Sequence, residues 1–157
     1  MNENKKISAE CACGQLSLEV ETAPVAQLVC HCSDCRKATG LPYVEIAFFE
    51  PIGCKAHGQS NKLTMKGGSG IDKTYYSCRE CGNTLYATVG ALNGAWAVIP
   101  SRLSPFVLEP HLHIWTSEKA DGVEIPLSAT QTLKGVPESV RDLFISTFFG
   151  KRLQPKQ

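Results

Sequence analysis

Hydrophobic and polar positions alternate in short stretches along this chain, and turn residues separate the stretches. The stretch Gln15–Val20 alternates strictly, with Leu16, Leu18 and Val20 on one side. Because successive side chains of a β-strand point to opposite faces, this pattern predicts a strand with one buried face. Further strands are predicted at Leu28–Cys32, Tyr43–Phe49, Leu63–Met65, Thr74–Ser77, Leu85–Val89, Trp96–Ile99 and His111–Trp115. Many short strands between turns rich in Gly, Pro, Asn and Ser indicate a mainly β fold, a complex β-sandwich or a partly open barrel.

One helical pattern stands out, near the C-terminus. Pro137 suits a first helical residue, and Gly150 suits the position after a helix. Apolar side chains recur between them at helical spacing, so we expect a helix over about residues 137–149. These side chains are Val140, Leu143, Phe144, Ile145, Phe148 and Phe149. The stripe favours a helix that closes the β core, and docking of the stripe on a second subunit, as a homodimer, is the alternative.

The length and composition fit one globular domain. A chain of 157 residues can bury roughly 70% of its unfolded surface around a single core. The hydrophobic content of 43%, with 20% charged residues, is that of a folded protein. We expect a single domain over residues 1–157, with its core at about residues 8–130. The segment Gly67–Gly70 lacks the frame of a phosphate-binding loop and is expected to be flexible, as is the tail Lys151–Gln157.

The net charge and the N-terminal residues indicate which binding partners and which cellular location to expect. A net charge of +1 gives no basic surface for nucleic acid or for an anionic membrane, so neither is expected as a partner. Met1–Ile7 is polar and lacks the apolar run of a secretory signal, and no stretch approaches the ~20 apolar residues of a membrane helix. We therefore expect a cytoplasmic protein, in which closely spaced cysteines bind metal rather than form disulfides.

Seven of the eight cysteines lie in three tight groups, which contain two, three and two cysteines. Structural zinc sites take four protein ligands in a tetrahedron, whereas a zinc ion with three protein ligands keeps one position for chemistry. The simplest partition joins the first group with the third, and predicts a structural zinc held by Cys11, Cys13, Cys78 and Cys81. The middle group then forms an open, catalytic zinc site of Cys30, Cys32 and Cys35. Two zinc ions per chain are expected.

The spacing within each group suits a metal. Residues i and i+2 of an extended segment face the same side, which is the arrangement expected for the Cys-x-Cys pairs of the first two groups. We expect a turn at Ser33–Asp34 to bring Cys35 to the same ion as its neighbours. From spacing alone, a second structural zinc closed by a further, unidentified ligand is an equal alternative to an open site.

Several other residues are candidates for parts of the site. His31 should point away from its two cysteine neighbours in an extended strand, which favours a core position or a contact behind the ligands over metal binding. Arg36 and Lys37 follow the middle group directly and are candidates to bind an anionic substrate. Cys54 lies outside the three groups, and we expect a buried, unreactive thiol there. Ordinary packing is the expectation for His113.

In combination, these motifs resemble those of the glutathione-dependent formaldehyde-activating enzyme family. The matching segments are Cys11–Gly14, Cys30–Gly40, Cys78–Gly82 and His113–Trp115, and the similarity extends from about Glu10 to about Lys119. The resemblance implies an Mss4-like fold of packed, bent β-sheets and the same partition of the cysteines into a structural and a catalytic zinc site. After Trp115 the chain departs from the family pattern, with Asp121–Gly122 and its own segment Val123–Gly150.

The activity named for the family joins glutathione and formaldehyde reversibly into S-hydroxymethylglutathione. The resemblance therefore implies a zinc-dependent carbon–sulfur lyase whose partners are a small thiol such as glutathione and an aldehyde. An open three-cysteine site agrees with this reaction, because zinc deprotonates a bound thiol and polarises a carbonyl group. The alternative from another functional class is a zinc-stabilised, non-catalytic protein-binding module that presents the C-terminal stripe. A zinc or thiol buffer ranks below both.

Overall fold

The computed structural model describes residues 6–66, 71–109 and 111–150. Within these residues the chain is mainly β, with eleven strands in two sheets. The strands are β1 (Ile7–Glu10), β2 (Ser17–Val20), β3 (Ala26–Cys30), β4 (Val44–Phe49), β5 (Cys54–His57), β6 (Ser60–Lys66), β7 (Asp72–Cys78), β8 (Thr84–Val89), β9 (Ala95–Val98), β10 (Leu112–Ile114) and β11 (Thr130–Gln131). The helices are α1 (Ser33–Thr39) and α2 (Glu138–Phe149), with short 3-10 helices η1 (Pro51–Gly53), η2 (Gly90–Leu92), η3 (Pro100–Arg102) and η4 (Thr116–Glu118). The predicted fold class is confirmed, while the two segments expected to be flexible lie outside the described residues.

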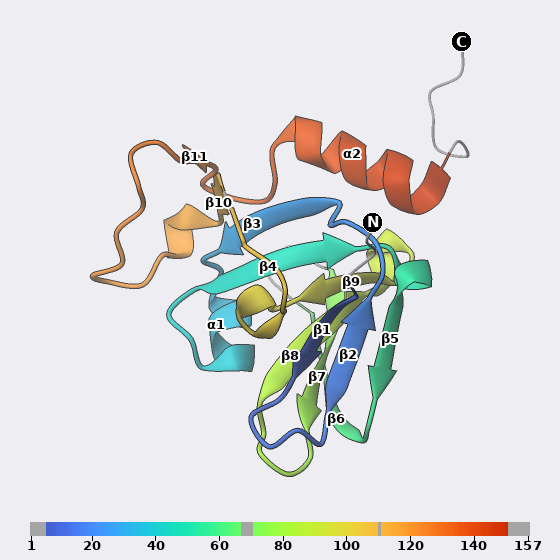
Figure 1. The fold of residues 1–157 in the computed structure, drawn as a ribbon. Helices are drawn as coiled ribbons and strands as arrows, with labels where there is room; N and C mark the ends of the chain where they lie inside the picture. The colour runs from blue at the N-terminus through green and yellow to red at the C-terminus, as the bar shows by residue number, and fades with distance from the viewer. Residues whose placement is uncertain (1–5, 67–70, 110, 151–157) are drawn as a thin grey trace.

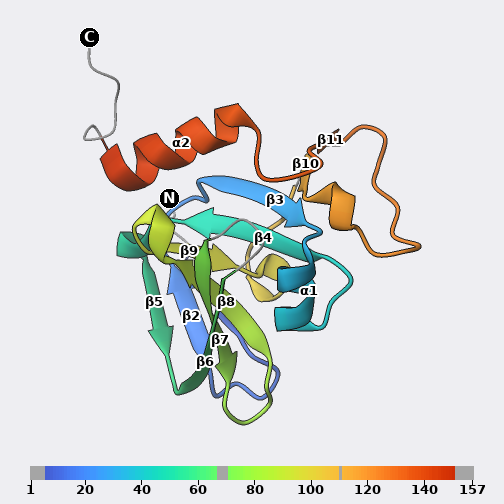
Figure 2. The ribbon, with the colours of Figure 1, turned by 180° about the vertical axis from the view of Figure 1, so that it is seen from behind.

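The two sheets differ in size and pack on each other. The small sheet has the strand order β1-β2-β5, and the large sheet has the order β11-β10-β3-β4-β9-β8-β7-β6. Neighbouring strands are antiparallel, except that β10 runs parallel to both β3 and β11. Figure 1 shows the small sheet on one side of β4 and helix α2 across the other side, and Figure 2 shows the same layers from behind.

Strand β4 is buried on both faces and separates two layers of the core. Ile46 and Phe48 point into a layer that also contains side chains of α2, whereas Ala47 and Phe49 point into the layer shared with the small sheet. Because alternate side chains of a strand point to opposite faces, a strand covered on both sides needs a nearly continuous apolar run. The sequence Val44–Phe49 has this character, with Glu45 as its one polar residue.

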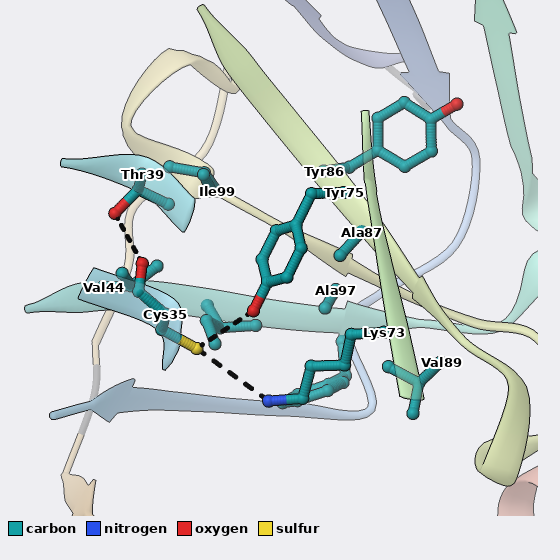
Figure 3. A pocket seen from close by; sticks show the side chains of 12 residues that line it. Cys35, Thr39, Val44, Lys73, Tyr75, Tyr86, Ala87, Val89, Ala97 and Ile99 are labelled. Atoms are coloured by element: carbon teal, nitrogen blue, oxygen red, sulfur yellow. Dashed lines mark hydrogen bonds between the residues drawn. The ribbon is translucent and has the colours of Figure 1, made fainter. Parts of the chain in front are cut away.

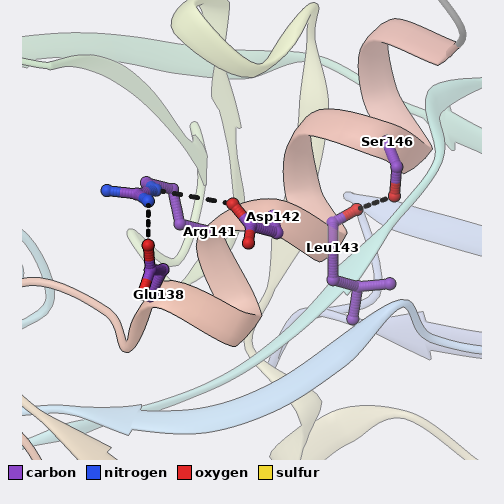
Figure 4. A network of polar contacts seen from close by, with 5 residues as sticks. All are labelled: Glu138, Arg141, Asp142, Leu143 and Ser146. Atoms are coloured by element: carbon purple, nitrogen blue, oxygen red, sulfur yellow. Dashed lines mark hydrogen bonds and ion pairs between the residues drawn. The ribbon is translucent and has the colours of Figure 1, made fainter. Parts of the chain in front are cut away.

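Helix α2 covers the outer layer of the core. Phe144 and Phe148 are buried, and the ring of Phe144 lies 4.9 Å from that of Phe48, measured between centroids. The exposed face of the helix carries charged groups, such as Arg141, whose Nη2 lies 3.1 Å from Oε2 of Glu138 (Figure 4). The predicted helix that closes the β core is therefore confirmed. Of the three aromatic side chains that a protein-binding module would present, Phe144 and Phe148 are buried and Phe149 is partly buried against the same core layer.

The structure adds elements that the hydrophobic pattern does not predict. Strands β1, β5 and β11 are edge strands, and the side chains of an edge strand alternate weakly because much of the strand faces solvent. In β5, for example, three of the four residues are exposed. Helix α1 buries only Cys35, so it has no apolar stripe to reveal it. Across the described part of the chain, none of the helices has the length and apolar character needed to cross a bilayer.

Candidate metal centres

Four cysteines from distant parts of the chain form the first cluster, which joins the two sheets. Cys11 and Cys13 follow β1, Cys78 ends β7, and Cys81 lies in the turn after it. The Sγ atoms of Cys11 and Cys13 are 3.7 Å apart, and those of Cys13 and Cys78 are 3.5 Å apart. All four sulfurs lie within 4.8 Å of one another. Zn–S bonds of ~2.3 Å in a tetrahedron place sulfurs ~3.8 Å apart, so the four thiols fit a zinc ion.

Two turns with left-handed glycines fold the chain around this cluster. Gly14 has a φ of 82° and Gly82 has a φ of 74°, a conformation that glycine adopts without the penalty that a side chain brings. The N–H of Gly14 donates a hydrogen bond to the carbonyl of Cys11 at 3.0 Å, and the N–H of Gly82 donates one to the carbonyl of Cys78 at 2.9 Å. Each turn therefore returns the second cysteine of its pair toward the first.

Main-chain N–H groups also point at the sulfurs. The nitrogen of Leu16 lies 3.2 Å from Sγ of Cys11, and that of Glu80 lies 3.3 Å from Sγ of Cys78. Burial raises the pKa of Cys11, but the hydrogen bonds from Leu16 and from the neighbouring thiols outweigh burial and lower the pKa to about 6. Such donors stabilise the thiolate, the form of cysteine that binds zinc. The surroundings as well as the spacing of this cluster therefore suit a metal.

Cys30, Cys32 and Cys35 form the second cluster, at the junction of β3 and α1. Their sulfurs also lie within 4.8 Å of one another, and the Sγ atoms of Cys30 and Cys32 are 3.2 Å apart. All three side chains are buried, in the core layer that α2 covers. No other His, Cys, Asp or Glu of residues 6–66, 71–109 and 111–150 joins this cluster. Three protein ligands leave one position of a tetrahedral zinc ion for a small molecule.

A helix, rather than the predicted turn, brings Cys35 to this cluster. Strand β3 ends at Cys30, and Cys32 is the N-cap of α1, with its Sγ 3.4 Å from the main-chain nitrogen of Cys35. Cys32 therefore lies beyond the predicted strand, although its backbone is extended and its sulfur faces that of Cys30 as expected. Ser33–Asp34 form the first turn of α1 instead of a reverse turn. The N-cap side chain accepts hydrogen bonds from Cys30 and from the start of the helix, but the contact with the Cys35 thiol and burial outweigh them and raise the pKa of Cys32.

Glu118 and Arg36 hold the first turn of α1 in place. The carboxylate of Glu118 accepts a hydrogen bond from the N–H of Ser33 at 2.7 Å. Arg36 donates through Nη2 to the carbonyl of Glu118 at 2.8 Å and through Nε to the carbonyl of His31 at 3.4 Å. The sequence analysis missed Glu118, which lies far along the chain. Arg36 thus has main-chain partners and Lys37 is exposed, and their role in substrate binding stays a prediction.

His31 packs behind the cysteines, as predicted. Its side chain is fully buried, and its Nε2 lies 2.9 Å from Nδ1 of His113, which is buried as well. Burial, together with the repulsion that a protonated His113 would exert, lowers the pKa of His31 to about 4, and burial lowers the pKa of His113 as well. Both rings are therefore neutral at pH 7, and one N–H joins them. This hydrogen bond connects the β3–α1 junction to β10.

A pocket beside Cys35 contains two polar groups that the sequence analysis missed (Figure 3). Nζ of Lys73 lies 3.9 Å, and Oη of Tyr75 lies 3.4 Å, from Sγ of Cys35. Lys73 and Tyr75 are two residues apart in β7, so both point to one face of the sheet. The other walls are mainly apolar, and include Val44, Ile46, Phe48, Ala87, Val89 and Ala97.

The thiols of the second cluster hold their protons unequally. Hydrogen bonds from Cys30 and Cys32 and the positive charge of Lys73 outweigh burial and lower the pKa of Cys35 to about 2, whereas the two partner thiols raise the pKa of Cys30. Burial raises the pKa of Tyr75, so its hydroxyl group keeps its proton. The cluster therefore favours a thiolate at Cys35, next to an ammonium group and a phenol.

The profile of the family described as "Glutathione-dependent formaldehyde-activating enzyme" matches residues 6–118. The chain belongs to this family. The match contains both cysteine clusters and ends at Glu118, the residue that holds α1. The resemblance stated from the cysteine motifs is confirmed.

A solved structure of a Rhodobacter sphaeroides protein is similar to this member of the formaldehyde-activating family. The TM-score is 0.50 and the sequence identity is 21%, over 64% of this chain and 90% of the other. At this identity the similarity concerns the fold alone. Among curated proteins, none matches the chain.

Membership of the formaldehyde-activating family agrees with two zinc sites. The sequence grouped the cysteines as the structure does, while the division into a structural and a catalytic ion stays a prediction. Cys54, the remaining cysteine, is half-buried, and its Sγ lies 3.4 Å from the carbonyl of Glu50. Burial raises the pKa of Cys54 to about 12, which agrees with the unreactive thiol expected there, although the residue is less deeply buried than predicted.

Proposed function

We propose that this chain is a zinc-dependent carbon–sulfur lyase that forms or cleaves a thiol–aldehyde adduct such as S-hydroxymethylglutathione. The main support is the cluster of Cys30, Cys32 and Cys35, where three buried thiols meet without a fourth protein ligand among the described residues, next to a pocket. Zinc at these thiols would act as a Lewis acid and stabilise a thiolate in its remaining position. The four-cysteine cluster would hold a second, structural zinc.

The pocket offers the reaction a hydrogen-bond donor and apolar walls. In the forming direction the S–H bond of the thiol breaks and its proton leaves to solvent. The sulfur then attacks the carbonyl carbon, the C–S bond forms, and the π electrons of the carbonyl move to oxygen, which takes up a proton. In the cleaving direction these changes are reversed. Tyr75 keeps its phenolic proton and lies 3.4 Å from Sγ of Cys35, so it can donate a hydrogen bond to the developing oxyanion. Apolar walls exclude water, which strengthens that hydrogen bond.

Exchange of formaldehyde between its free and glutathione-bound forms, followed by NMR, tests this proposal. Thiols react with formaldehyde without a catalyst, so the readout is the exchange rate above the spontaneous rate. We expect the zinc-loaded protein to accelerate exchange and Cys32→Ser to return it to the spontaneous rate, because one zinc ligand is lost. Serine can take over the N-cap hydrogen bond that Cys32 accepts, so the variant should keep its circular dichroism spectrum.

Cys54→Ser is the matched control for the loss of a thiol. Cys54 lies outside both clusters, and its replacement should leave the acceleration intact. The proposal is wrong if the zinc-loaded wild-type protein, with both ions confirmed by elemental analysis, exchanges formaldehyde no faster than glutathione does alone. It is also wrong if Cys32→Ser folds normally and keeps the full rate.

A further inference from the structure

We propose that Lys73 makes the open position of the three-cysteine site selective for a thiolate over a neutral ligand. The inference rests on the proposed function, since it presupposes zinc at Cys30, Cys32 and Cys35 with one position free. It adds a ligand-selecting residue and names the charge of the ligand that the site accepts.

The zinc-loaded three-cysteine site would have an unbalanced charge. A zinc ion carries two positive charges and three cysteine thiolates carry three negative ones, so the loaded site has one excess negative charge. A fourth, anionic ligand adds another, whereas a neutral ligand such as imidazole adds none. All three cysteines are buried, and a buried charge without a partner is strongly unfavourable. Without a nearby cation, the site should therefore prefer a neutral fourth ligand.

Lys73 places a positive charge beside this site. Its Nζ lies 3.9 Å from Sγ of Cys35, and Figure 3 shows the side chain running along the pocket to reach that sulfur. Among the described residues that line the pocket, Lys73 is the one with a cationic side chain. Arg36, which follows Cys35 in α1, donates to main-chain carbonyls instead. The negative charge of Asp34 also acts on Lys73, which adds to the excess that this ammonium group offsets.

The apolar walls of the pocket determine how strongly the positive charge of Lys73 attracts an anion. Side chains such as Val44, Ile46 and Phe48 line the same pocket as Lys73, and an apolar lining screens the attraction of an ammonium group for an anion less than bulk water does. The same walls offer no partner for a carboxylate. The part of the substrate that enters the pocket is therefore expected to be uncharged apart from its sulfur.

Cobalt(II) in place of zinc allows ligand binding to be read without turnover, because the visible spectrum of cobalt changes when its fourth ligand changes. Two probes are titrated at one pH: 2-mercaptoethanol, which binds as a thiolate and releases its proton to solvent, and imidazole, which binds neutral. We expect Lys73→Met to weaken the thiol by about ten-fold or more, because the added charge loses its partner. The affinity for imidazole should stay unchanged, and Lys73→Arg should keep most of the thiol affinity.

Lys66→Met is the matched control. Lys66 is an exposed residue of β6 that does not line the pocket, and its replacement should alter neither affinity. An unchanged thiol affinity in Lys73→Met would overturn the inference, and so would an equal loss of both ligands, which would indicate a structural role. If neither probe alters the spectrum of the unsubstituted protein, the open position does not exist, and the proposed function fails together with the inference.

Discussion

Gly82 is the position at which the four-cysteine cluster depends most directly on backbone conformation. Its φ of 74° is left-handed, and apart from Gly82 and its two chain neighbours no described residue has a heavy atom within 4 Å of the point where a Cβ would stand. The penalty for a side chain therefore comes from φ alone, and we expect Gly82→Ala to lower the free energy of unfolding by about 1–2 kcal/mol. Gly90 is equally open but lacks a positive φ, so Gly90→Ala should change it by less than about 0.5 kcal/mol. Urea denaturation of the zinc-loaded proteins measures both, and equal effects would contradict the argument.

The hydrogen bond between His31 and His113 should contribute measurably to stability. His113→Ala removes the partner of a fully buried imidazole, which should lower the free energy of unfolding by about 1–3 kcal/mol. His111→Ala, at an exposed position two residues earlier, should cost less than about 0.5 kcal/mol. Thermal unfolding of both variants checks the difference. Similar melting temperatures would mean that the imidazole pair contributes little to stability.

At the scale of elements, strand β7 serves both cysteine clusters. Lys73 and Tyr75 point to the face on which Cys35 lies, whereas Tyr76 and Cys78 belong to the layer between the two sheets. The alternation of a strand explains this division. One strand therefore supplies a ligand to the predicted structural zinc and two polar groups to the pocket beside the other site.

Helix α2 should contribute to the stability of the fold through one buried face. Phe144 packs on Phe48 and is 5% exposed, whereas the adjacent Leu143 is 42% exposed. We expect Phe144→Ala to lower the free energy of unfolding by about 3–5 kcal/mol through lost burial and a cavity. Leu143→Ala should cost less than about 1 kcal/mol. Denaturant titration followed by circular dichroism compares the two variants, and a costlier Leu143→Ala would mean that the helix packs with another face.

At the scale of the whole molecule, the four-cysteine cluster connects two sheets that otherwise meet through side-chain packing. Cys11 and Cys13 follow β1 of the small sheet, and Cys78 ends β7 of the large one. Structural zinc contributes on the order of 10 kcal/mol to folding. We expect a chelator to expose the amide groups of β1 and β2 before those of β3 and β4, as measured by hydrogen exchange with mass spectrometry. Simultaneous exposure of all four strands would show that the small sheet does not depend on this zinc separately.

The sequence by itself determined the features that depend on local spacing, which are the cysteine groups, the interior strands and the C-terminal helix. The cysteines were grouped correctly because the ligand pairs are local and only one partition yields a closed set of four. The interior strands β2 and β4 and the helix α2 followed from apolar periodicity, since each buries a full face or both faces. The family could be named from the same cysteine motifs.

Only the tertiary structure decided which distant side chains meet. Lys73 lies 38 positions from Cys35, and His113 lies 82 positions from His31, and these contacts depend on the order of strands in the large sheet, which local spacing does not encode. Helix α1 could not be predicted from the sequence, because it buries a single side chain and has no apolar stripe. The role of Cys32 as its N-cap follows from the end of β3 at Cys30, which the hydrophobic pattern does not locate. The ligands are a local property of the chain, whereas their charge environment arises from long-range pairing of strands.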